Sequence, residues 1–546
     1  MKRKAVAAVL TAVMVASMFT GCGSDNGSSS AKSASAASAA SAANDTVDED
    51  GKVNGIMYQE GLPLVDEGDY TFSIFCDDSS ESGEFIMLDE FKKQTNVDVD
   101  LKIYPYETAT ERLNLDLNSG DYADVIGGWT LSDNAILTYG VNQGVFIPLE
   151  DYFEKYCPNI SAILDLPGVR EKMTAPDGHI YTIPYVCAGT TVGYSPYINT
   201  KWLENVGMSM PTTTDEFEAV LKAFKEQDAN GNGDASDEIP FSTDPNNKHI
   251  EAMAGYFGLP MNKLGIAIQN EKVVYGGVSD TYREFLSWFH KLYAEGLVDV
   301  ELYTQDSSTW EGKGNQDLYG VSIAYGSNEF TGIPAAEERG DFDSMPVLNT
   351  DKDGIWLRDT EGFSVYRTQA VITNKAEHPE IICRWFDNAF ALENGIGCNR
   401  GPVGVIVNKE DDGYHAIDTT TLSEEDQEKY SWGNLWPQSL PKYLPVDFEF
   451  VEEHPMYDEK KATEEAYEAN LTKEIIPSYW IDLDKIDTFS DTNTAIKDFF
   501  EQQQAQFVCG ELDIDNDADW QAYVDGMYSL GLEDWVATQG IEEIAK

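Results

Sequence analysis

Cysteine and histidine are scarce in this chain and widely spread. It has 7 cysteines and 6 histidines in 546 residues, with no CxxC pair, no zinc-like spacing and no HExxH motif. These absences argue against a histidine-based metalloenzyme and against a dense disulfide framework. We interpret the cysteines that follow Cys22 mainly as buried free thiols, and one or two disulfides stay open as an alternative.

Basic residues are also few. Lys and Arg number 37 against 96 Asp and Glu, which gives a formal net charge of −59. A field of that sign disfavours nucleic acid and anionic lipid surfaces, so we expect no nucleic-acid partner. The solubility of an exposed protein explains this acidity more simply than an acidic functional patch does.

Long hydrophobic runs are absent beyond the N-terminal segment. No later stretch approaches the ~18–20 uncharged apolar residues that a membrane-spanning helix requires. The chain also contains no GxSxG elbow and no P-loop. These absences weaken the case for a secreted hydrolase without removing it, because Asp and Glu are numerous enough to supply a catalytic carboxylate pair.

The N-terminal segment indicates where the protein works. A basic start and an uncharged apolar run of about fifteen residues predict a secretory signal peptide over residues 1–21. The four residues that end at Cys22 resemble the lipobox of bacterial lipoproteins, although Phe19 replaces the usual Leu. The resemblance implies that Cys22 carries a diacylglyceryl anchor, and two acyl chains hold a protein stably on a membrane. An ordinary secretory leader with a chance cysteine is the alternative.

Residues 22–52 consist mostly of Ser, Ala and Gly, with acidic residues towards the end. A segment with so few apolar side chains behaves as a flexible coil, so we expect a tether. The folded part is then held at the extracellular face of the cell membrane. Its contact with the lipid bilayer is expected through the acyl anchor only.

Beyond the tether, alternating strand and helix patterns predict an α/β fold. The order strand, helix, strand, helix, strand occupies residues 70–76, 84–94, 97–103, 108–117 and 121–129. This order predicts an open, mostly parallel sheet with helices on its faces. Ligands of such sheets lie at the carboxyl ends of strands, where Asp78 and Trp129 fall.

A family resemblance follows from several segments in a fixed order. Residues 176–185 and 193–203 resemble the crossing segment of extracellular solute-binding proteins of ABC transporters, of the maltose-binding type. Pro211 and a Thr/Asp cap before an amphipathic helix are similar too. Further similar segments are residues 295–299, 320–326 and 371–385.

The resemblance implies a two-lobed, periplasmic-binding-protein-like fold of type II. Each lobe would be a mostly parallel sheet flanked by helices, and crossing segments would join the lobes. We place the first lobe at residues 66–187 with 362–395, and the second at 188–345 with 396–546. Such a protein does no chemistry: it traps a ligand as the lobes close.

The implied function is capture of an oligosaccharide and its delivery to the transmembrane permease subunits of an ABC importer, with the receptor acting as a monomer. A receptor for peptides or another solute class is one alternative. A secreted glycoside hydrolase is the other. Sugar cleavage would separate the hydrolase from a receptor, and the identity of the bound ligand would separate the two kinds of receptor.

Candidate ligand residues follow from the chemistry of sugars, which present apolar C–H faces and polar rims. A receptor stacks aromatic rings on the faces and directs carboxylates and amides at the hydroxyls. The aromatic candidates are Trp129, Tyr185, Trp310, Tyr325, Trp356, Trp432 and Trp436, with Asp78, Asp124, Asn328 and Glu361 as polar partners. Core packing is the alternative for each of them.

One loop has the pattern of a calcium site. Oxygen-bearing side chains alternate from Asp228 and glycine stands at the sixth position, but Ile239 replaces the final Glu of an EF-hand loop. The loop is more similar to the calcium loop of alginate-binding solute receptors, with one extra residue before the acidic pair. By that likeness a structural calcium ion would be held by Asp228, Asn230, Asn232, Asp234, Asp237 and Glu238. A surface turn rich in Asp and Asn is the alternative.

A second acidic run, residues 513–519, alternates in the same way. It has Ala518 where the calcium loop has glycine, so the tight turn is harder to make. We interpret this run as a solvated loop before a helix.

Overall fold

The first lobe is built on a five-stranded sheet, which the computed structural model shows in the order β4-β3-β5-β13-β6. Its strands are β3 (Tyr70–Asp77), β4 (Val97–Tyr104), β5 (Val125–Gly127), β6 (Thr182–Ala188) and β13 (Phe363–Ile372). Helices α1 (Ile86–Thr95) and α2 (Tyr106–Ser119) are the crossovers between β3, β4 and β5, which are parallel. The predicted β-α-β-α-β order is confirmed.

The sheet is mixed rather than mostly parallel. Strand β13 runs antiparallel to both β5 and β6, because it enters from the second lobe instead of through a helical crossover. The second sheet has the order β12-β7-β11-β8, with β8 and β11 parallel and the other pairs antiparallel. These strands are β7 (Ser195–Asn199), β8 (Ile239–Thr243), β11 (Tyr319–Ala324) and β12 (Phe342–Ser344).

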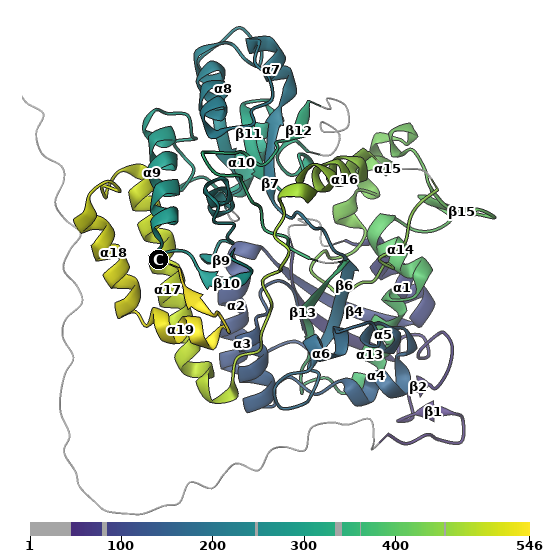
Figure 1. Cartoon of the computed structure of the whole chain (residues 1–546). Coiled ribbons are helices and arrows are strands. Elements are labelled where there is room, and N and C mark those ends of the chain that lie inside the picture. Colours follow the sequence, from purple (N-terminus) through teal and green to yellow (C-terminus); the bar gives the residue numbers. More distant parts are fainter. Residues whose placement is uncertain are drawn as a thin grey trace, which may run out of the picture. The chain divides into compact units, whose positions relative to one another are not determined.

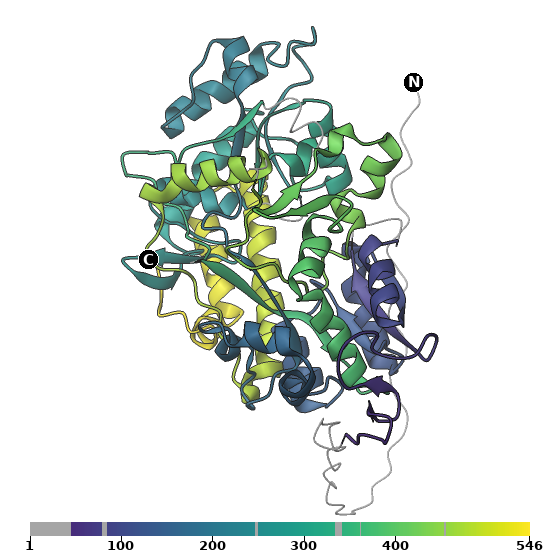
Figure 2. The same cartoon turned by 90° about the vertical axis from the view of Figure 1, so that its right-hand side faces the viewer.

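The structure describes residues 45–78, 84–245, 249–332, 341–360, 362–451 and 455–545. The anchor candidate Cys22, the first part of the tether and the ligand candidate Glu361 lie outside the described residues. The described residues, from Asp45 to Ala545, belong to one unit (Figures 1 and 2). Within the described part, no helix combines the length and the apolar character that crossing a membrane requires.

Further elements surround the first sheet. They are β1 (Lys52–Val53), β2 (Met57–Tyr58), α3 (Asp133–Ala135), the π-helical turn Ile136–Asn142, α4 (Glu150–Tyr156), α5 (Pro158–Leu164), α6 (Val169–Met173), α13 (Pro379–Ala389), α14 (Leu392–Arg400), β14 (Val407–Glu410), β15 (Gly413–Ala416) and α15 (Glu424–Lys429). Asp45 accepts a hydrogen bond from the Tyr156 hydroxyl, and Val53 is buried in this lobe. Residues from Asp45 onward thus already contact this lobe, although the tether was expected to extend to residue 52.

The second lobe carries most of the long helices. Its elements are α7 (Thr200–Val206), α8 (Thr214–Glu226), the 3₁₀ helix Ile250–Phe257, β9 (Ile266–Gln269), β10 (Lys272–Tyr275), α9 (Asp280–Ala294), α10 (Ser307–Asn315), α11 (Asn328–Thr331), α16 (Pro455–Tyr467), α17 (Ile486–Cys509), α18 (Asp517–Ser529), α19 (Leu532–Thr538) and β16 (Glu543–Ile544). Strand β16 joins β10 and β9 in a third sheet. Helix α17 packs on α9, so the C-terminal helices, drawn in yellow in Figure 1, form part of this lobe.

Helix α8 shows how the sequence specifies these elements. The Thr213 side chain accepts a hydrogen bond from the Glu216 backbone N–H, and the Glu216 side chain accepts one from the Thr212 backbone N–H. Two backbone N–H groups at the start of the helix thereby gain acceptors. Phe217, Val220, Leu221 and Phe224 then lie on one buried face.

Each large sheet has its own hydrophobic core. The cluster around the first sheet includes Cys398, Trp436 and Leu440, which the sequence-based boundary at residue 395 assigned to the second lobe. Helix α14 continues through Gly395, which packs against the Tyr443 carbonyl, and so keeps this segment with the first sheet. We therefore propose that the first lobe includes residues 396–443 and that the chain crosses after Tyr443.

Two crossing segments run side by side between the lobes. The Gly189 N–H donates to the Gly362 carbonyl at 3.0 Å, and the Asp359 N–H donates to the Thr191 carbonyl at 3.0 Å. The segments approach closely because glycine leaves room: a Cβ on Gly189 would meet Thr360 Oγ1 and lie 3.0 Å from the Phe363 backbone.

A Gly189→Ala variant should therefore be less stable, by about 1–3 kcal/mol, because the added methyl group overpacks this contact. Chemical denaturation of the purified protein measures the change. Gly312→Ala is the matched control: a Cβ on Gly312, inside α10, meets nothing within 4 Å, so this change should stabilise by about 0.5–1 kcal/mol. Equal effects of the two variants would contradict the close packing of the segments.

Candidate functional site

The loop after β5 places Trp129 at the carboxyl edge of the first sheet. The buried Asp77 carboxylate accepts hydrogen bonds from the backbone N–H groups of Trp129, at 3.0 Å, and Thr130, at 2.6 Å. Gly128 has φ +134°, and a Cβ there would overlap the same carboxylate, so the position requires glycine. Burial raises the pKa of Asp77, and the two N–H groups partly offset this effect. These contacts fix the backbone at Trp129, and 47% of the residue stays exposed.

Two tyrosines continue the surface that Trp129 begins. Tyr185 on β6 and Tyr366 on β13 are direct cross-strand partners, and their rings stack with centroids 5.5 Å apart. The Trp129 ring lies edge-on, 5.3 Å from Tyr366 and 6.3 Å from Tyr185. We call Trp129, Tyr185 and Tyr366 the aromatic floor; 38% of Tyr366 is exposed.

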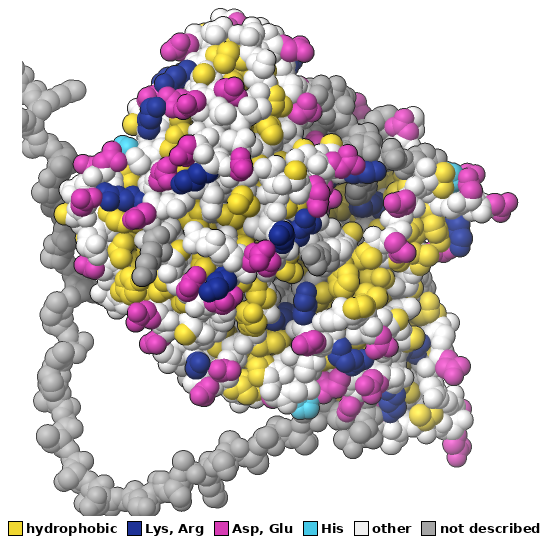
Figure 3. All heavy atoms as spheres, in the orientation of Figure 1, with side chains coloured by type: hydrophobic (Ala, Val, Ile, Leu, Met, Phe, Trp, Pro, Cys, Tyr) yellow, Lys and Arg dark blue, Asp and Glu magenta, His cyan; other side chains and the backbone are white. Residues whose placement is uncertain are grey.

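Aromatic residues of the second lobe lie near this floor. Tyr325 follows β11 and Tyr194 precedes β7, with ring centroids 6.2 Å apart, and Tyr194 stacks on His249 at 4.0 Å. Burial raises the pKa of Tyr325 to about 12, and the Tyr366 phenol contributes to the rise. Tyr325 therefore lies within electrostatic range of the floor. Figure 3 shows yellow hydrophobic and dark-blue basic side chains around a hollowed part of the face that carries β6 and α16.

Helix α16 holds the second-lobe residues in place. Lys460 Nζ donates to the carbonyls of Gly193, at 2.5 Å, and Tyr325, at 2.9 Å, and lies 4.0 Å from the Tyr325 ring centroid. Glu464 accepts a hydrogen bond from the Thr191 N–H at 2.7 Å. Burial lowers the pKa of Lys460 to about 8, although nearby carboxylates oppose the shift. One helix thus connects a crossing segment to the end of β11.

Several predicted ligand residues come together here. Trp129, Tyr185 and Tyr325 are in the two aromatic groups, and Asn328 begins α11, in the turn after Tyr325. The chain from Trp432 returns to the edge of β6, and 46% of Trp432 is exposed. The buried Asp78 accepts a hydrogen bond from the Gln438 N–H at 2.7 Å, which ties the end of β3 to the segment that follows Trp432.

Other predicted ligand residues lie elsewhere. Trp310, Trp356 and Trp436 are buried in hydrophobic clusters, because aromatic residues of loops and short helices fill cores without showing any helical period. Asp124 accepts hydrogen bonds from the backbone and side chain of Ser73 at the amino end of β5, away from the edge that carries Trp129. We do not retain these four residues in the ligand site that we propose.

Three further residues that we propose for the ligand site, Tyr366, Tyr194 and Lys442, were not predicted from the sequence. Tyr366 belongs to the strand that follows a crossing segment, and an aromatic residue at that place was the available signal. Tyr194 stands in a segment identified as a crossing, beside the predicted Tyr185 on the same crossing. Lys442 carried no signal in its local sequence.

The predicted calcium loop is closed by its own side chains. Asp228 Oδ2 accepts a hydrogen bond from the Gly233 N–H at 3.0 Å, and Asn230 Oδ1 accepts one from the Asn232 N–H at 2.9 Å. Asn232 Oδ1 accepts one from the Asp234 N–H at 2.7 Å, while its amide donates to Asp237 Oδ2 at 2.8 Å. The six predicted ligands therefore surround one short turn of the second lobe.

Two carboxylate oxygens of this loop are buried without a partner in the described part of the chain. They are Asp228 Oδ1 and Glu238 Oε2, while Glu238 Oε1 accepts a hydrogen bond from the Ala229 N–H. Burial raises the pKa of Glu238, and the Asp237 carboxylate adds to the rise. A hard cation would satisfy both oxygens, so the donor set fits calcium.

A second group with metal-ligand chemistry lies on the β14–β15 hairpin. Ligand atoms of Glu410, Asp412 and His415 all lie within 4.8 Å of one another, and His415 Nε2 is 2.9 Å from Asp412 Oδ1. Both carboxylates are exposed. We assign no metal to this group, because exposed acidic side chains gather on hairpins without one.

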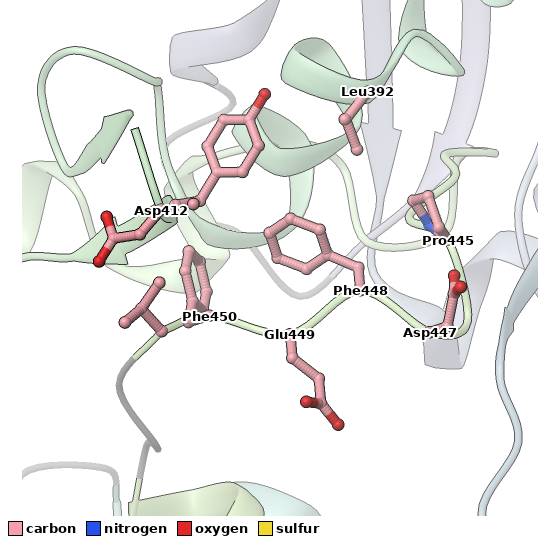
Figure 4. Close-up of a pocket in the computed structure, with 10 residues that line it drawn as sticks. Leu392, Asp412, Pro445, Asp447, Phe448, Glu449 and Phe450 are labelled. Carbon is pink, nitrogen blue, oxygen red and sulfur yellow. The ribbon is translucent and has the colours of Figure 1, made fainter. Parts of the chain in front are cut away.

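A cavity of about 480 Å³ opens beside the same hairpin, against residues 445–451 (Figure 4). Its wall contains the rings of Phe448 and Phe450, 5.2 Å apart, and the carboxylates of Asp412 and Glu449. None of the residues that line it comes from the second sheet. Closure of the two lobes would not cover a ligand there, so we place the functional site at the aromatic floor.

Comparison with known proteins identifies the class. Residues 78–395 match the family model described as bacterial extracellular solute-binding protein, and the chain belongs to this family. The resemblance seen in the sequence is confirmed.

Individual relatives and a solved structure are similar to this chain. The fructooligosaccharide ABC transporter substrate-binding protein FusA of Streptococcus pneumoniae is 31% identical over 411 residues, 73% of this chain and 70% of FusA. Lipoprotein LipO of Bacillus subtilis is 28% identical over 280 residues, 50% of this chain and 52% of LipO. A solved structure of Streptococcus pneumoniae FusA, an EF-hand mutant in complex with fructo-nystose, has a TM-score of 0.73 at 26% identity and covers 86% of this chain and 98% of that one. The two-lobed fold class is thereby confirmed.

Proposed function

We propose that this protein is the receptor of an ABC importer and captures an oligosaccharide between its two lobes. The observation that carries the proposal is that both lobes expose aromatic residues within electrostatic range of one another, Trp129 and Tyr366 from the first lobe and Tyr325 from the second. Such rings stack on the C–H faces of sugars. The fructooligosaccharide relative and the fructo-nystose complex support this ligand class.

The proposed mechanism is hinge closure, which the ligand favours by contacting both lobes at once. A ligand shifts the open and closed populations only as far as its affinities for them differ. The floor belongs to the first lobe and Tyr325 to the second, so a bound sugar gains its second set of contacts only on closure. The paired crossing segments around Gly189 and Gly362 are the place where the backbone would bend.

The proposed ligand residues combine predicted and newly found ones. They are Trp129, Tyr185, Tyr194, Tyr325, Asn328, Tyr366 and Trp432, with Asp78 as the residue that positions the loop near Trp432.

Thermal unfolding of the purified protein against an oligosaccharide panel tests the function. A ligand at about 100 times its dissociation constant should stabilise by about 2.7 kcal/mol and raise the melting temperature. The panel contains fructooligosaccharides such as kestose, and then other neutral and acidic oligosaccharides. A peptide library in the same assay examines the rival solute class; stabilisation by peptides alone would overturn the proposal.

The hydrolase alternative is examined in the same samples. The matched family consists of solute-binding proteins, and a receptor should return its sugar intact. Chromatography of the panel after long incubation would reveal cleavage, and cleavage products would contradict the receptor function.

Calcium is proposed as a structural cofactor of the second lobe. The ion would be held by the backbone carbonyl of Asp234 and by five side chains, those of Asp228, Asn230, Asn232, Asp237 and Glu238. The support is the pair of unpartnered buried carboxylate oxygens, together with the EF-hand named for the FusA structure. A bound ion would neutralise this acidic turn and fix its shape.

The anchor and the import partner complete the proposal. Cys22 would carry the acyl chains and tether the folded unit outside the membrane. There the protein would act as a monomer and present its closed form to the permease subunits. The LipO relative is named a lipoprotein. Partition of the protein and of a Cys22→Ser variant between detergent and aqueous phases tests the anchor; a variant that stays in the detergent phase would exclude it.

A further inference from the structure

Lys442 is a buried cation without a partner that compensates its charge. The residue is 2% exposed. Among the described residues, the ammonium has neither a hydrogen bond nor an ion pair. Its Nζ lies 5.5 Å from the centroid of the Trp432 ring. Burial lowers the pKa of Lys442 to about 8. A nearly buried charge without an ion pair costs desolvation and adds little to stability, so the position calls for a reason other than stability.

The backbone register shows which way Lys442 points. Tyr443 forms a parallel bridge with Val186 of β6, and both residues pack into the core of the first lobe. Neighbouring residues of extended chains point to opposite faces, so Lys442 lies on the face of Tyr185 and Cys187. Burial raises the pKa of Cys187 to about 11, and the nearby ammonium of Lys442 partly lowers it, which agrees with this placement. That face of β6 carries the aromatic floor.

The charged groups around Lys442 come from several elements. Arg400 at the end of α14 is close enough to lower the pKa of Lys442, while Asp78 at the end of β3 raises it. Asp78 Oδ2 accepts a hydrogen bond from the Gln438 N–H, and Asp78 forms no ion pair with Lys442. Among the described residues, Lys442 thus makes no ion pair, and its ammonium can still donate hydrogen bonds to oxygen atoms of a ligand.

We infer that Lys442 is a ligand-binding residue whose ammonium donates hydrogen bonds to oxygen atoms of a sugar unit bound beside Trp432. The inference rests on the proposed function and deepens it, because it names the chemistry of one subsite. The half-exposed indole offers a face for the ring of the sugar, and the ammonium, 5.5 Å from the indole centroid, would lie beside the polar rim. The oxygen is a hydroxyl in a neutral sugar and a carboxylate in a uronic acid.

The Lys442→Met variant tests the inference, because Met keeps the unbranched shape and removes the charge. Affinity for kestose and for trigalacturonate, both measured by calorimetry, should fall roughly tenfold or more for whichever sugar the wild type binds. The unliganded variant should melt at the same temperature as the wild type or higher, because an unpaired buried charge has gone. A larger loss for kestose assigns the hydroxyl, and a larger loss for trigalacturonate assigns the carboxylate.

Two further variants separate binding from folding. Lys375→Met is the matched control, since Lys375 Nζ lies 5.3 Å from the Tyr122 ring centroid on the exposed surface of the same lobe. It should leave affinity unchanged. Lys442→Gln keeps a neutral N–H donor and should bind with intermediate affinity. A lower melting temperature of Lys442→Met with unchanged affinity would make Lys442 a structural residue and overturn the inference, whereas a wild type that binds no oligosaccharide would overturn the proposed function itself.

Discussion

Replacing Trp129 with Ala should weaken oligosaccharide binding roughly 30-fold, or about 2 kcal/mol, while the melting temperature of the unliganded protein stays nearly constant. The loop is held by backbone hydrogen bonds to Asp77 and by Gly128, not by the indole, and the indole is half exposed. The side chain can therefore be removed without opening a core cavity. Isothermal titration calorimetry measures the affinity and scanning calorimetry the stability.

Tyr528→Ala provides the control for an exposed aromatic residue outside the site. Tyr528 lies on α18 of the second lobe and is 42% exposed, close to the value for Trp129. Its loss should leave affinity unchanged. If both variants bound the sugar as tightly as the wild type, the aromatic floor would not be the binding surface.

Removal of calcium should have the second large effect, on stability. At about 100 times its dissociation constant, calcium should stabilise the protein by about 2.7 kcal/mol, and a chelator should remove this stabilisation. A Glu238→Gln variant should melt at one temperature with or without calcium, because it loses the negative charge of the carboxylate whose buried Oε2 has no hydrogen-bond partner among the described residues. Asp517→Asn, in the acidic run without glycine, should retain the full response. A chelator response that survives in Glu238→Gln would place the ion elsewhere.

The pH dependence of stability should change sign with calcium. Burial and the Asp237 carboxylate hold the pKa of Glu238 above its usual value. Without calcium, this carboxyl group costs stability as the pH rises from the unfolded-state pKa through the raised folded-state pKa, because the folded protein binds the proton more tightly. With calcium, ionised Glu238 is a ligand, so the contribution of the ion should grow over the same rise. Melting curves between pH 4 and 7, with calcium and with chelator, measure both slopes.

The sequence predicted the first lobe best where local patterns are strong. Strand β3 and helices α1 and α2 have clear periods of two and 3.6 residues, and their observed limits differ from the predicted ones by a few residues at most. Trp129 was found for a similar reason, since a glycine pair directly after a strand indicates a loop at the sheet edge. The six loop residues from Asp228 to Glu238 were predicted from their spacing and from the likeness to the calcium loop of alginate-binding receptors, and their metal role stays a prediction.

Other parts of the site depend on contacts between distant segments. Tyr366 meets Tyr185 only because β13 returns from the other lobe and pairs in one particular register. We assign the chain between Gly401 and Tyr443 to the first lobe because Trp436 packs on Trp385, a contact that no local pattern encodes. The direction of Lys442 likewise follows from the bridge between Tyr443 and Val186.

The aromatic floor joins a constant part to a variable part. Tyr185 and Tyr366 are neighbours across a hydrogen-bonded ladder, so the spacing of their rings is set by the geometry of the sheet and changes little with sequence. Trp129 and Trp432 stand outside that ladder, on a loop and a short turn where substitutions and insertions are tolerated. Divergence among related receptors should therefore alter ligand preference first through the segments around these two tryptophans, while the paired tyrosines persist as a shared platform.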